Sequence, residues 1–315
     1  MEGKRGQFEF SWIFAIIVGA VILFLTFFFL GKEIFLQETK TTIEQTRGFD
    51  LLLGPFSYLG AIAEASTNEI IFSSKTNLSF DCNSENLGYD IMTINAKQQS
   101  IDYEIYDKYI FARDIETSKF DVLSMPVEIP FRIADAIILI PEGDEKYCFV
   151  NAPTDIQDEL HDLNLSFEFF RTESMCPVNS IKICFDSSGC DIKVYDKSNG
   201  NYDYGQVIHG SDNMFFAGRA LLYSAIFSSQ KVYRCNVKRL MNRLEILSKI
   251  YSDKSNSMAQ KGCDNNYAAA LNELKNAARS VSSNINTASV NSIKVLYEKA
   301  LRIEQMNDYS DCSLY

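Results

Sequence analysis

The chain has 315 residues, of which 46% are hydrophobic and 23% are charged, and its formal net charge is −11 at pH 7. A surface of this sign repels polyanions, so the composition argues against a nucleic-acid partner. The four charged residues among the first 31, Glu2, Lys4, Arg5 and Glu9, cancel one another. The net charge therefore belongs to the part of the chain beyond them.

The first predicted element is apolar. Residues 10–31 carry no charge, and as a helix rising about 1.5 Å per residue they would span about 33 Å, enough to cross a bilayer. A removable secretion signal has a shorter apolar run and a small-x-small site, which this run lacks. We predict a cytoplasmic leader at 1–9 and a permanent single-pass transmembrane helix, or signal anchor, at 10–31, with the lipid bilayer as its partner. Lys4 and Arg5 favour a cytoplasmic N-terminus and an extracytoplasmic remainder.

A polar segment comes next. Residues 32–47 contain sparse apolar positions and end before Gly48, where a helix would stop, so we predict a helical stalk. The apolar sequence FDLLLGPFSYLGAIAEA follows. Its Gly54-Pro55 pair breaks any helix, which indicates a joint between stalk and globular domain.

Residues 48–213 are predicted to form a mixed α/β ectodomain with mainly antiparallel strands, in a chain of the α+β class. Between residues 70 and 196, short runs alternate apolar and polar side chains, as half-buried strands do. The helix-like TDIQDELHDLN lies between two such runs and permits one βαβ crossover. Asn199-Gly200 predicts a hairpin turn. The same loop fails as a calcium site, because Gly200 and Val207 break the ligand pattern.

Residues 214–315 are predicted to be helical. The apolar MFFAGRALLYSAIF, which begins this region, is too short to cross a membrane and is expected to be a buried helix. Three amphipathic helices follow, and linkers at 255–265 and 282–286 are short enough to make neighbours antiparallel. Their apolar positions, spaced by three or four residues, are Val237, Leu240, Leu244, Leu247 and Tyr251, then Tyr267, Leu271, Leu274, Ala278 and Val281, then Val290, Ile293, Tyr297, Ala300 and Ile303.

All eight cysteines lie beyond the apolar N-terminal run. They are Cys82, Cys148, Cys176, Cys184, Cys190, Cys235, Cys263 and Cys312. No pair has the C-x2-C spacing of a zinc site, and the chain has only two histidines. We therefore expect disulfides in an extracytoplasmic compartment and no metal site.

One disulfide can be chosen from the helix order. Cys263 ends the linker after the first amphipathic helix and Cys312 follows the third. In an up, down, up arrangement both lie at the same end, so Cys263–Cys312 is the preferred pair, with a stabilisation of about 3–4 kcal/mol. The pairing of the other six cysteines is left open.

The sequence indicates no reaction. It contains no nucleophile elbow, phosphate loop, H-E-x-x-H or dinucleotide fingerprint. His161 and His209 are expected to be structural, so no catalytic residue or cofactor is predicted and the chain is not expected to be an enzyme. The sequons at Asn77 and Asn164 fit an exterior surface, and whether they are glycosylated is left open.

The N-terminal KRGQFEFSWIFAIIVGAVILFL resembles the class III signal of archaeal type IV pilin-like proteins, over about 25 of the 315 residues. The resemblance implies cleavage between Gly6 and Gln7 and a helix that packs into a filament core. In that family Ser and then Glu follow the Gln. Here Glu9 precedes Ser11, so the possible assembly carboxylate lies nearer the new N-terminus.

The whole chain also resembles single-pass archaeal envelope proteins of unassigned function, whose helical C-terminus ends near Cys-x-Leu-Tyr, here 312–315. Residues 48–315 exceed an ordinary pilin head. The leading hypothesis is a membrane-anchored cell-surface protein whose disulfide-supported ectodomain acts in binding or envelope assembly, with itself or other envelope or pilus proteins as partners. The alternative is a minor pilin processed at Gly6-Gln7, and an ectoenzyme is less favoured.

Overall fold

The structure is a computed structural model that describes residues 16–26, 65–96, 99–142, 146–263, 267–310 and 312–315. The chain divides into two units, Met1–Leu53 and Gly54–Tyr315. Of the described residues, 16–26 belong to the first unit and all the others belong to the second.

The described part of the first unit is a helix at residues 16–26. At about 1.5 Å per residue these described helical residues extend about 17 Å, roughly half of the bilayer hydrocarbon. No helix among the described residues is long and apolar enough to span a membrane. The transmembrane helix that the fold-class prediction placed at 10–31 is therefore wrong for this structure. The predicted leader at 1–9 and stalk at 32–47 lie outside the described residues.

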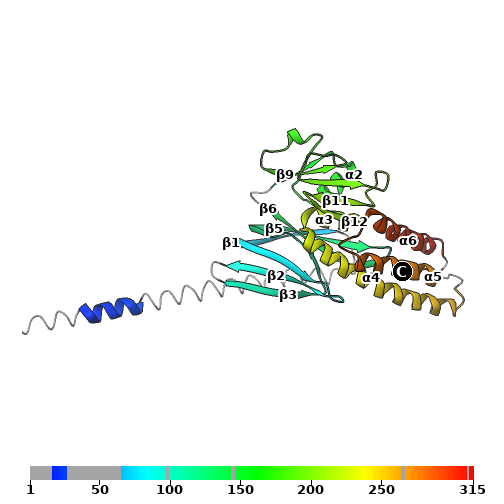
Figure 1. Ribbon diagram of the computed structural model, residues 1–315, viewed down its shortest axis with the longest axis horizontal. Coiled ribbons are helices and arrows are strands. Elements are labelled where there is room, and N and C mark those ends of the chain that lie inside the picture. Colours follow the sequence, from blue (N-terminus) through cyan, green and yellow to red (C-terminus); the bar gives the residue numbers. More distant parts are fainter. Residues whose placement is uncertain (1–15, 27–64, 97–98, 143–145, 264–266, 311) are drawn as a thin grey trace, which may run out of the picture. The chain divides into compact units, whose positions relative to one another are not determined.

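The second unit contains two six-stranded sheets and a set of helices (Figure 1). The first sheet has the strand order β3-β2-β1-β5-β6-β4. Its strands are β1 (Ser66–Asn83), β2 (Tyr89–Ala96), β3 (Gln99–Tyr106), β4 (Tyr109–Phe111), β5 (Ile115–Glu128) and β6 (Arg132–Glu142). Neighbours are antiparallel except β4 and β6, which are parallel.

The second sheet has the order β12-β11-β10-β9-β7-β8. Its strands are β7 (Lys146–Val150), β8 (Glu168–Phe170), β9 (Ser180–Phe185), β10 (Ile192–Asp196), β11 (Tyr204–His209) and β12 (Asp212–Ala217). The pairings β7–β8, β7–β9 and β9–β10 are parallel, while β10–β11 and β11–β12 are antiparallel. Both sheets are thus mixed. The prediction of mainly antiparallel strands fits the first sheet but not the second, in which three of the five pairings are parallel.

Two local predictions in this sheet agree with the structure. Helix α2 (Thr154–Asp162) connects the parallel strands β7 and β8, as the predicted crossover requires. Asn199 and Gly200 have φ of 61° and 95° in the turn between the antiparallel strands β10 and β11. Both residue types tolerate positive φ, which such a turn needs.

The apolar stretch that begins at Met214 is not one helix. Its first four residues end β12, and Gly218, with φ of 80°, leads into helix α3 (Arg219–Phe227). A short apolar run is compatible with either a buried strand or a buried helix. For this reason the sequence pattern alone predicted a helix for residues that end a strand. Residues 220–227 of α3 are all buried. This helix contacts β4, β5 and β6 of the first sheet and β11 and β12 of the second.

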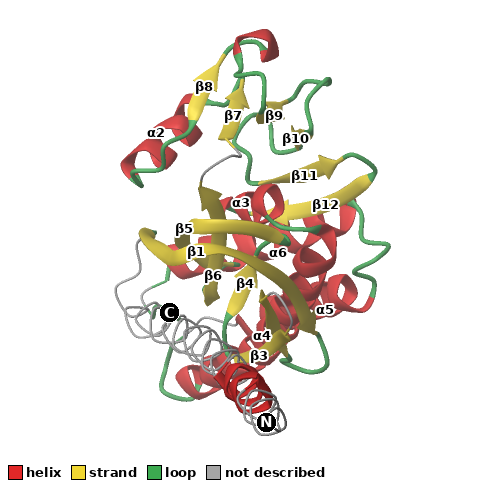
Figure 2. Cartoon of the chain, turned by 90° about the vertical axis from the view of Figure 1, so that its left-hand side faces the viewer, coloured by secondary structure: helices red, strands yellow, loops and turns green. Residues whose placement is uncertain are grey.

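Helices α4 (Gln230–Ala259), α5 (Tyr267–Ser283) and α6 (Val290–Asp308) close the unit. Ser282 of α5 bonds Asn242 of α4, and Arg279 bonds Glu245, so α4 and α5 run in opposite directions. By the same reasoning α5 and α6 are antiparallel. The Tyr267 hydroxyl donates a hydrogen bond to the carbonyl oxygen of Met306, and the Lys299 ammonium donates one to the carboxylate of Glu273. Figure 2 shows α4 and α5 beside the first sheet and α2 beside the second.

One hydrophobic core contains residues of both sheets and all five of these helices. It includes Phe111 and Ile138 from the first sheet, Phe149 and Phe216 from the second, and Leu240 from α4. The predicted boundary between 213 and 214 therefore runs through a shared core. The two regions fold together, because neither buries its apolar side chains alone.

Candidate binding groove beside helix α4

Two hollows lie along the N-terminal half of α4, against the turn between β1 and β2. The first encloses about 580 Å³ and the second about 570 Å³. Both are lined in part by Ser84 and Lys238, so they are neighbours along the helix. We call the two together the α4 groove. Volumes of this size suit a small ligand or a few side chains of a partner.

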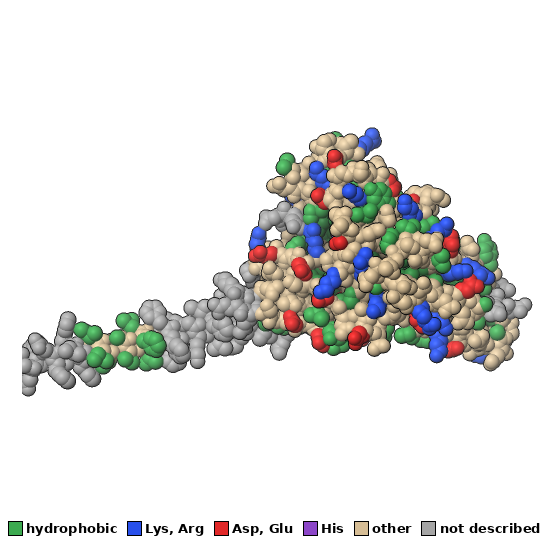
Figure 3. All heavy atoms as spheres, in the orientation of Figure 1, with side chains coloured by type: hydrophobic (Ala, Val, Ile, Leu, Met, Phe, Trp, Pro, Cys, Tyr) green, Lys and Arg blue, Asp and Glu red, His purple; other side chains and the backbone are tan. Residues whose placement is uncertain are grey.

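Three cations lie along one side of α4. Lys231, Arg234 and Lys238 are spaced by three and four residues and all line the first hollow. The Lys231 ammonium lies 2.6 Å from the carboxylate of Asp81, and an Arg234 Nη donates to a backbone carbonyl at 3.1 Å. Lys238 has no ion pair within the described part of the chain. Figure 3 shows that cations and acids are mixed over one face of this unit. Against that mixed surface, three cations along one side of a single helix form a local cluster of positive charge.

A disulfide forms part of the groove wall. Cys82 near the end of β1 pairs with Cys235 of α4 across a sequence separation of 153, with Cα atoms 6.1 Å apart. Both residues are half-buried and both line the first hollow. The Sγ atom of Cys82 also lies 3.8 Å from Oδ1 of Asn236. This cystine ties the first sheet to the helix at the site.

Behind the cystine lies a buried ionic network. Nη1 of Arg239 donates to Asp90 Oδ2 at 2.8 Å, and Nδ2 of Asn236 donates to Asp90 Oδ1 at 2.7 Å. The backbone N–H of Ile110 also donates to Asp90, at 3.0 Å. The side chains of Arg239 and Asp90 are 1% and 3% exposed, so the pair is removed from water. Burial raises the pKa of Asp90 to about 6, and the charge of Arg239 opposes that rise.

The remaining donors of Arg239 are also occupied. Its guanidinium donates to the carbonyl oxygens of Leu87, Gly88 and Lys108 at 2.7, 3.3 and 2.9 Å, and it lies 4.7 Å from the ring centroid of Tyr109. A buried ion pair of this kind is tolerated only when its other hydrogen-bonding groups are satisfied. The network thus fixes β2, β4 and α4 against one another and makes the back of the groove rigid.

The two histidines lie in different surroundings. His161 is exposed in the last turn of α2. His209 ends β11, and burial, followed by the charge of Arg113, lowers its pKa to about 4. Its Nε2 atom is buried without a hydrogen-bond partner among the described residues. His209 is therefore neutral at physiological pH, and neither histidine lines the α4 groove.

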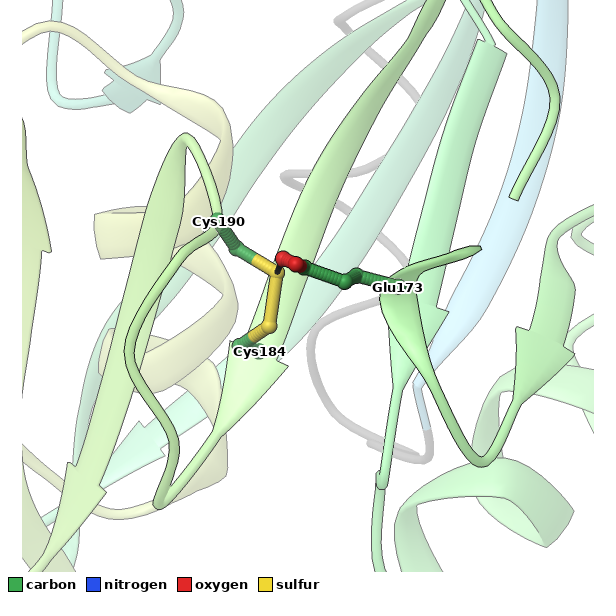
Figure 4. A group of neighbouring side chains, drawn as sticks. All are labelled: Glu173, Cys184 and Cys190. Carbon is green, nitrogen blue, oxygen red and sulfur yellow. Dashed lines mark hydrogen bonds between the residues drawn. A yellow bond between two sulfur atoms is a disulfide. The ribbon is translucent and has the colours of Figure 1, made fainter. Parts of the chain in front are cut away.

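Two side-chain groups within the described residues have the spacing of metal ligands. The first is Glu173 with Cys184 and Cys190. Figure 4 shows the two sulfurs joined in a disulfide with the Glu173 carboxylate pointing at it. Thiolates are the ligand form of cysteine, so the paired sulfurs do not fit a metal.

The second group is Glu69, Asp121 and Glu142 on β1, β5 and β6. Lys119 already occupies it, with Nζ 2.5 Å from Glu69 Oε2 and 2.6 Å from Glu142 Oε2. Burial, followed by a hydrogen bond with Glu142, raises the pKa of Asp121 to about 7. The ammonium supplies the positive charge that a metal would bring, so the group is explained as an ion-pair cluster.

The structure pairs all eight cysteines. Cys263 pairs with Cys312, which is the pair expected from the sequence. The pairs that the sequence left open are Cys82–Cys235, Cys148–Cys176 and Cys184–Cys190. The possible processing site Gly6-Gln7 and the possible assembly residue Glu9 lie outside the described residues.

Sequence reasoning missed the groove and the network behind it. A signal existed in α4: Val232, Asn236 and Arg239 follow helical spacing and share one face. An amide and a guanidinium on the apolar side of an amphipathic helix indicate buried polar partners. Comparison with known proteins adds nothing here, because no family model, no curated protein and no solved structure matches the chain.

Proposed function

We propose that the protein is a cell-surface protein whose cysteine-bearing unit lies outside the cytoplasm and acts by binding or in envelope assembly. The observation that carries this proposal is the complete pairing of eight cysteines into four disulfides. Structural disulfides form and persist in oxidising compartments and are rare in the cytosol. The acidic net charge of −11 suits a soluble exterior domain.

We assign the binding role to the α4 groove. It combines three cations with Asp81 and Asp212, the hydroxyl groups of Ser84 and Ser229, and a rigid back. Such a surface can pair charges and exchange hydrogen bonds with a ligand. It holds no histidine, and its cysteines are joined in a disulfide, so its chemistry favours recognition over catalysis.

The proposal includes location at the cell membrane, with the N-terminus in the cytoplasm. The supporting observations are in the sequence: Lys4 and Arg5 precede an uncharged run, and every cysteine follows it. The partners proposed are the bilayer and either further copies or other envelope proteins.

Thiol labelling of intact cells tests the compartment. A membrane-impermeant maleimide is applied with and without prior treatment by a membrane-impermeant phosphine. We expect no labelling before reduction, and labelling of the half-buried pairs Cys82–Cys235 and Cys263–Cys312 after reduction of the intact cells. Free thiols that react only after the cells are lysed would refute the exterior location.

Photo-crosslinking tests the groove. A photoreactive residue replaces Gln230, which lines the first hollow, or Lys294, an exposed position on α6 that serves as the matched control. We expect the Gln230 position to give a discrete crosslinked product in cells and the control to give none. Equal crosslinking from both positions would remove the groove from the proposal.

A second candidate function is a minor pilin or pilus-like subunit. The specific observation is the dipeptide Gly6-Gln7 between a short basic leader and the apolar run. Intact mass of the protein purified from its own membranes separates the two candidates. Loss of residues 1–6 supports a processed subunit, and a retained Lys4-Arg5 leader refutes it.

A further inference from the structure

We propose that the Cys82–Cys235 cystine is a site of thiol–disulfide exchange that accepts a small thiol as its substrate. Attack falls on the sulfur of Cys82, and Cys235 leaves as the thiolate. The inference concerns reactivity at the groove wall and does not depend on which ligand the groove binds.

Accessibility distinguishes this cystine from two of the others. Cys184 and Cys190 are 1% and 7% exposed, so both sulfurs of their disulfide are shielded from a reductant. In Cys148–Cys176 one sulfur is shielded, because Cys148 is 0% exposed, while Cys176 is half-buried and lines neither hollow of the groove. Cys82 and Cys235 are half-buried and line a hollow of about 580 Å³. A small thiol can enter a space of this size and approach the sulfurs.

The charge of nearby residues distinguishes the Cys82–Cys235 disulfide from the Cys263–Cys312 disulfide. Cys263 and Cys312 are also half-buried, but Asp264 follows the first and Asp311 precedes the second in the sequence. Cys235 has Arg234 before it and Lys238 one helical turn after it, and both cations line the hollow. Positive neighbours lower the pKa of a cysteine thiol, whereas negative neighbours raise it.

Which sulfur the incoming thiolate attacks depends on the charges around Cys82 and around Cys235. Cys82 has Asp81 before it, and its sulfur lies 3.8 Å from the amide oxygen of Asn236, so negative charge on this sulfur is disfavoured. Lys231 is paired with Asp81, and the other two cations that line the hollow with Cys235 are Arg234 and Lys238. The sulfur with the lower thiol pKa is the better leaving group.

The reaction balances without another reagent. The attacking thiolate forms a bond to Cys82 Sγ, the Sγ–Sγ bond breaks, and its electron pair passes to Cys235 Sγ. The product is a mixed disulfide on Cys82 and a thiolate on Cys235. A second equivalent of thiol then releases Cys82 as a thiol and leaves as the oxidised disulfide of the reagent. The protein gains two electrons and two protons in total.

Opening the cystine does not require unfolding of the network behind it. Asp90, Asn236 and Arg239 continue to join β2 to α4 through direct hydrogen bonds. The end of β1 loses its covalent link to the helix and keeps the ion pair of Asp81 with Lys231. Exchange would thus change the wall of the groove while its back stays in place.

The experiment uses the folded chain and glutathione as the probe. Timed samples are quenched with iodoacetamide and mapped by peptide mass spectrometry. We expect the first product to carry glutathione on Cys82 and the alkyl group on Cys235, ahead of any opening of Cys263–Cys312. Glutathione found first on Cys235, or earlier opening of Cys263–Cys312, would overturn the proposal.

Charge variants test the cause. In Arg234→Gln/Lys238→Gln we expect opening of Cys82–Cys235 to slow by about threefold or more, since exchange rates depend on thiol pKa. The Cys263–Cys312 rate serves as an internal reference for correct folding, and Lys294→Gln as the matched surface control. Slowing must occur with uncharged dithiothreitol as well. An effect limited to anionic glutathione, or no effect, would refute the assignment of Cys235 as the leaving thiolate.

Discussion

Replacement of Arg239 by methionine should strongly destabilise the second unit. The change removes the partner of the buried Asp90 carboxylate and leaves three backbone carbonyls without their guanidinium donor. Methionine keeps much of the apolar stem, so the loss is chiefly electrostatic. Removing one partner of a buried ion pair costs about 3–5 kcal/mol in free energy of unfolding. The side-chain exposures of 1% and 3% place this pair in that class.

Urea unfolding with the disulfides intact measures the effect. With an m value of about 3 kcal/mol per molar, the midpoint should fall by about 1–1.7 M. Lys294→Met is the matched control, because its ion pair with Glu298 is exposed and should be worth less than about 0.5 kcal/mol.

A double variant tests the reasoning itself. Asp90→Asn in the Arg239→Met background removes the unpaired buried charge, so the double variant should be more stable than Arg239→Met alone. Two results would refute the idea that Asp90 and Arg239 form a buried, charged pair in solution. The first is a loss of less than about 1 kcal/mol in free energy of unfolding for Arg239→Met, and the second is a double variant no more stable than Arg239→Met.

Three further predictions concern the same unit. The pKa of Asp90 is raised from 3.8 to about 6, so its contribution to stability is present below pH 3.8 and lost as the pH rises through 6. Urea titrations should therefore show about 2 kcal/mol less pH dependence of the free energy of unfolding between pH 4 and 7 in Asp90→Asn. Gly88→Ala should lower the urea midpoint far more than Gly210→Ala, because both have positive φ, of 54° and 56°, but only the Cβ at 88 would meet a backbone carbonyl oxygen, at 1.9 Å. Equal losses would contradict that steric account. Cys263→Ser/Cys312→Ser should cost about 4 kcal/mol, given their sequence separation of 49, and an unchanged thermal midpoint would refute it.

Local signals in the sequence predicted local structure well. The Asn199-Gly200 turn needs only two residues that accept positive φ, and both are adjacent in the chain. In α5 all five predicted apolar positions, from Tyr267 to Val281, are buried. The Cys263–Cys312 pair followed from counting antiparallel helices, whose order is set by short linkers. In each case the interacting groups lie close in sequence or are related by a simple chain reversal.

Features that join distant segments were not accessible in this way. Cys82 and Cys235 are 153 residues apart, and nothing near either one identifies its partner. The parallel pairing of β7 with β9 joins strands about 30 residues apart, and it depends on which strands meet after the chain has folded. The site shares this property, because Asp90 acquires its role only when α4 brings Arg239 to it. Sequence periodicity reports burial, but it does not report which buried groups meet.

Helix α3 has a consequence for the modularity of the chain. Eight of its residues are buried between strands of both sheets, so separating the sheets would expose an almost wholly apolar helix to water. Both sheets are therefore needed to keep this helix out of water. Within the described residues from 65 onward, α3 is therefore not a boundary between separable domains. Replacing either sheet by a different domain would leave the other sheet without the partner that covers α3. The second unit is therefore expected to unfold as one cooperative unit.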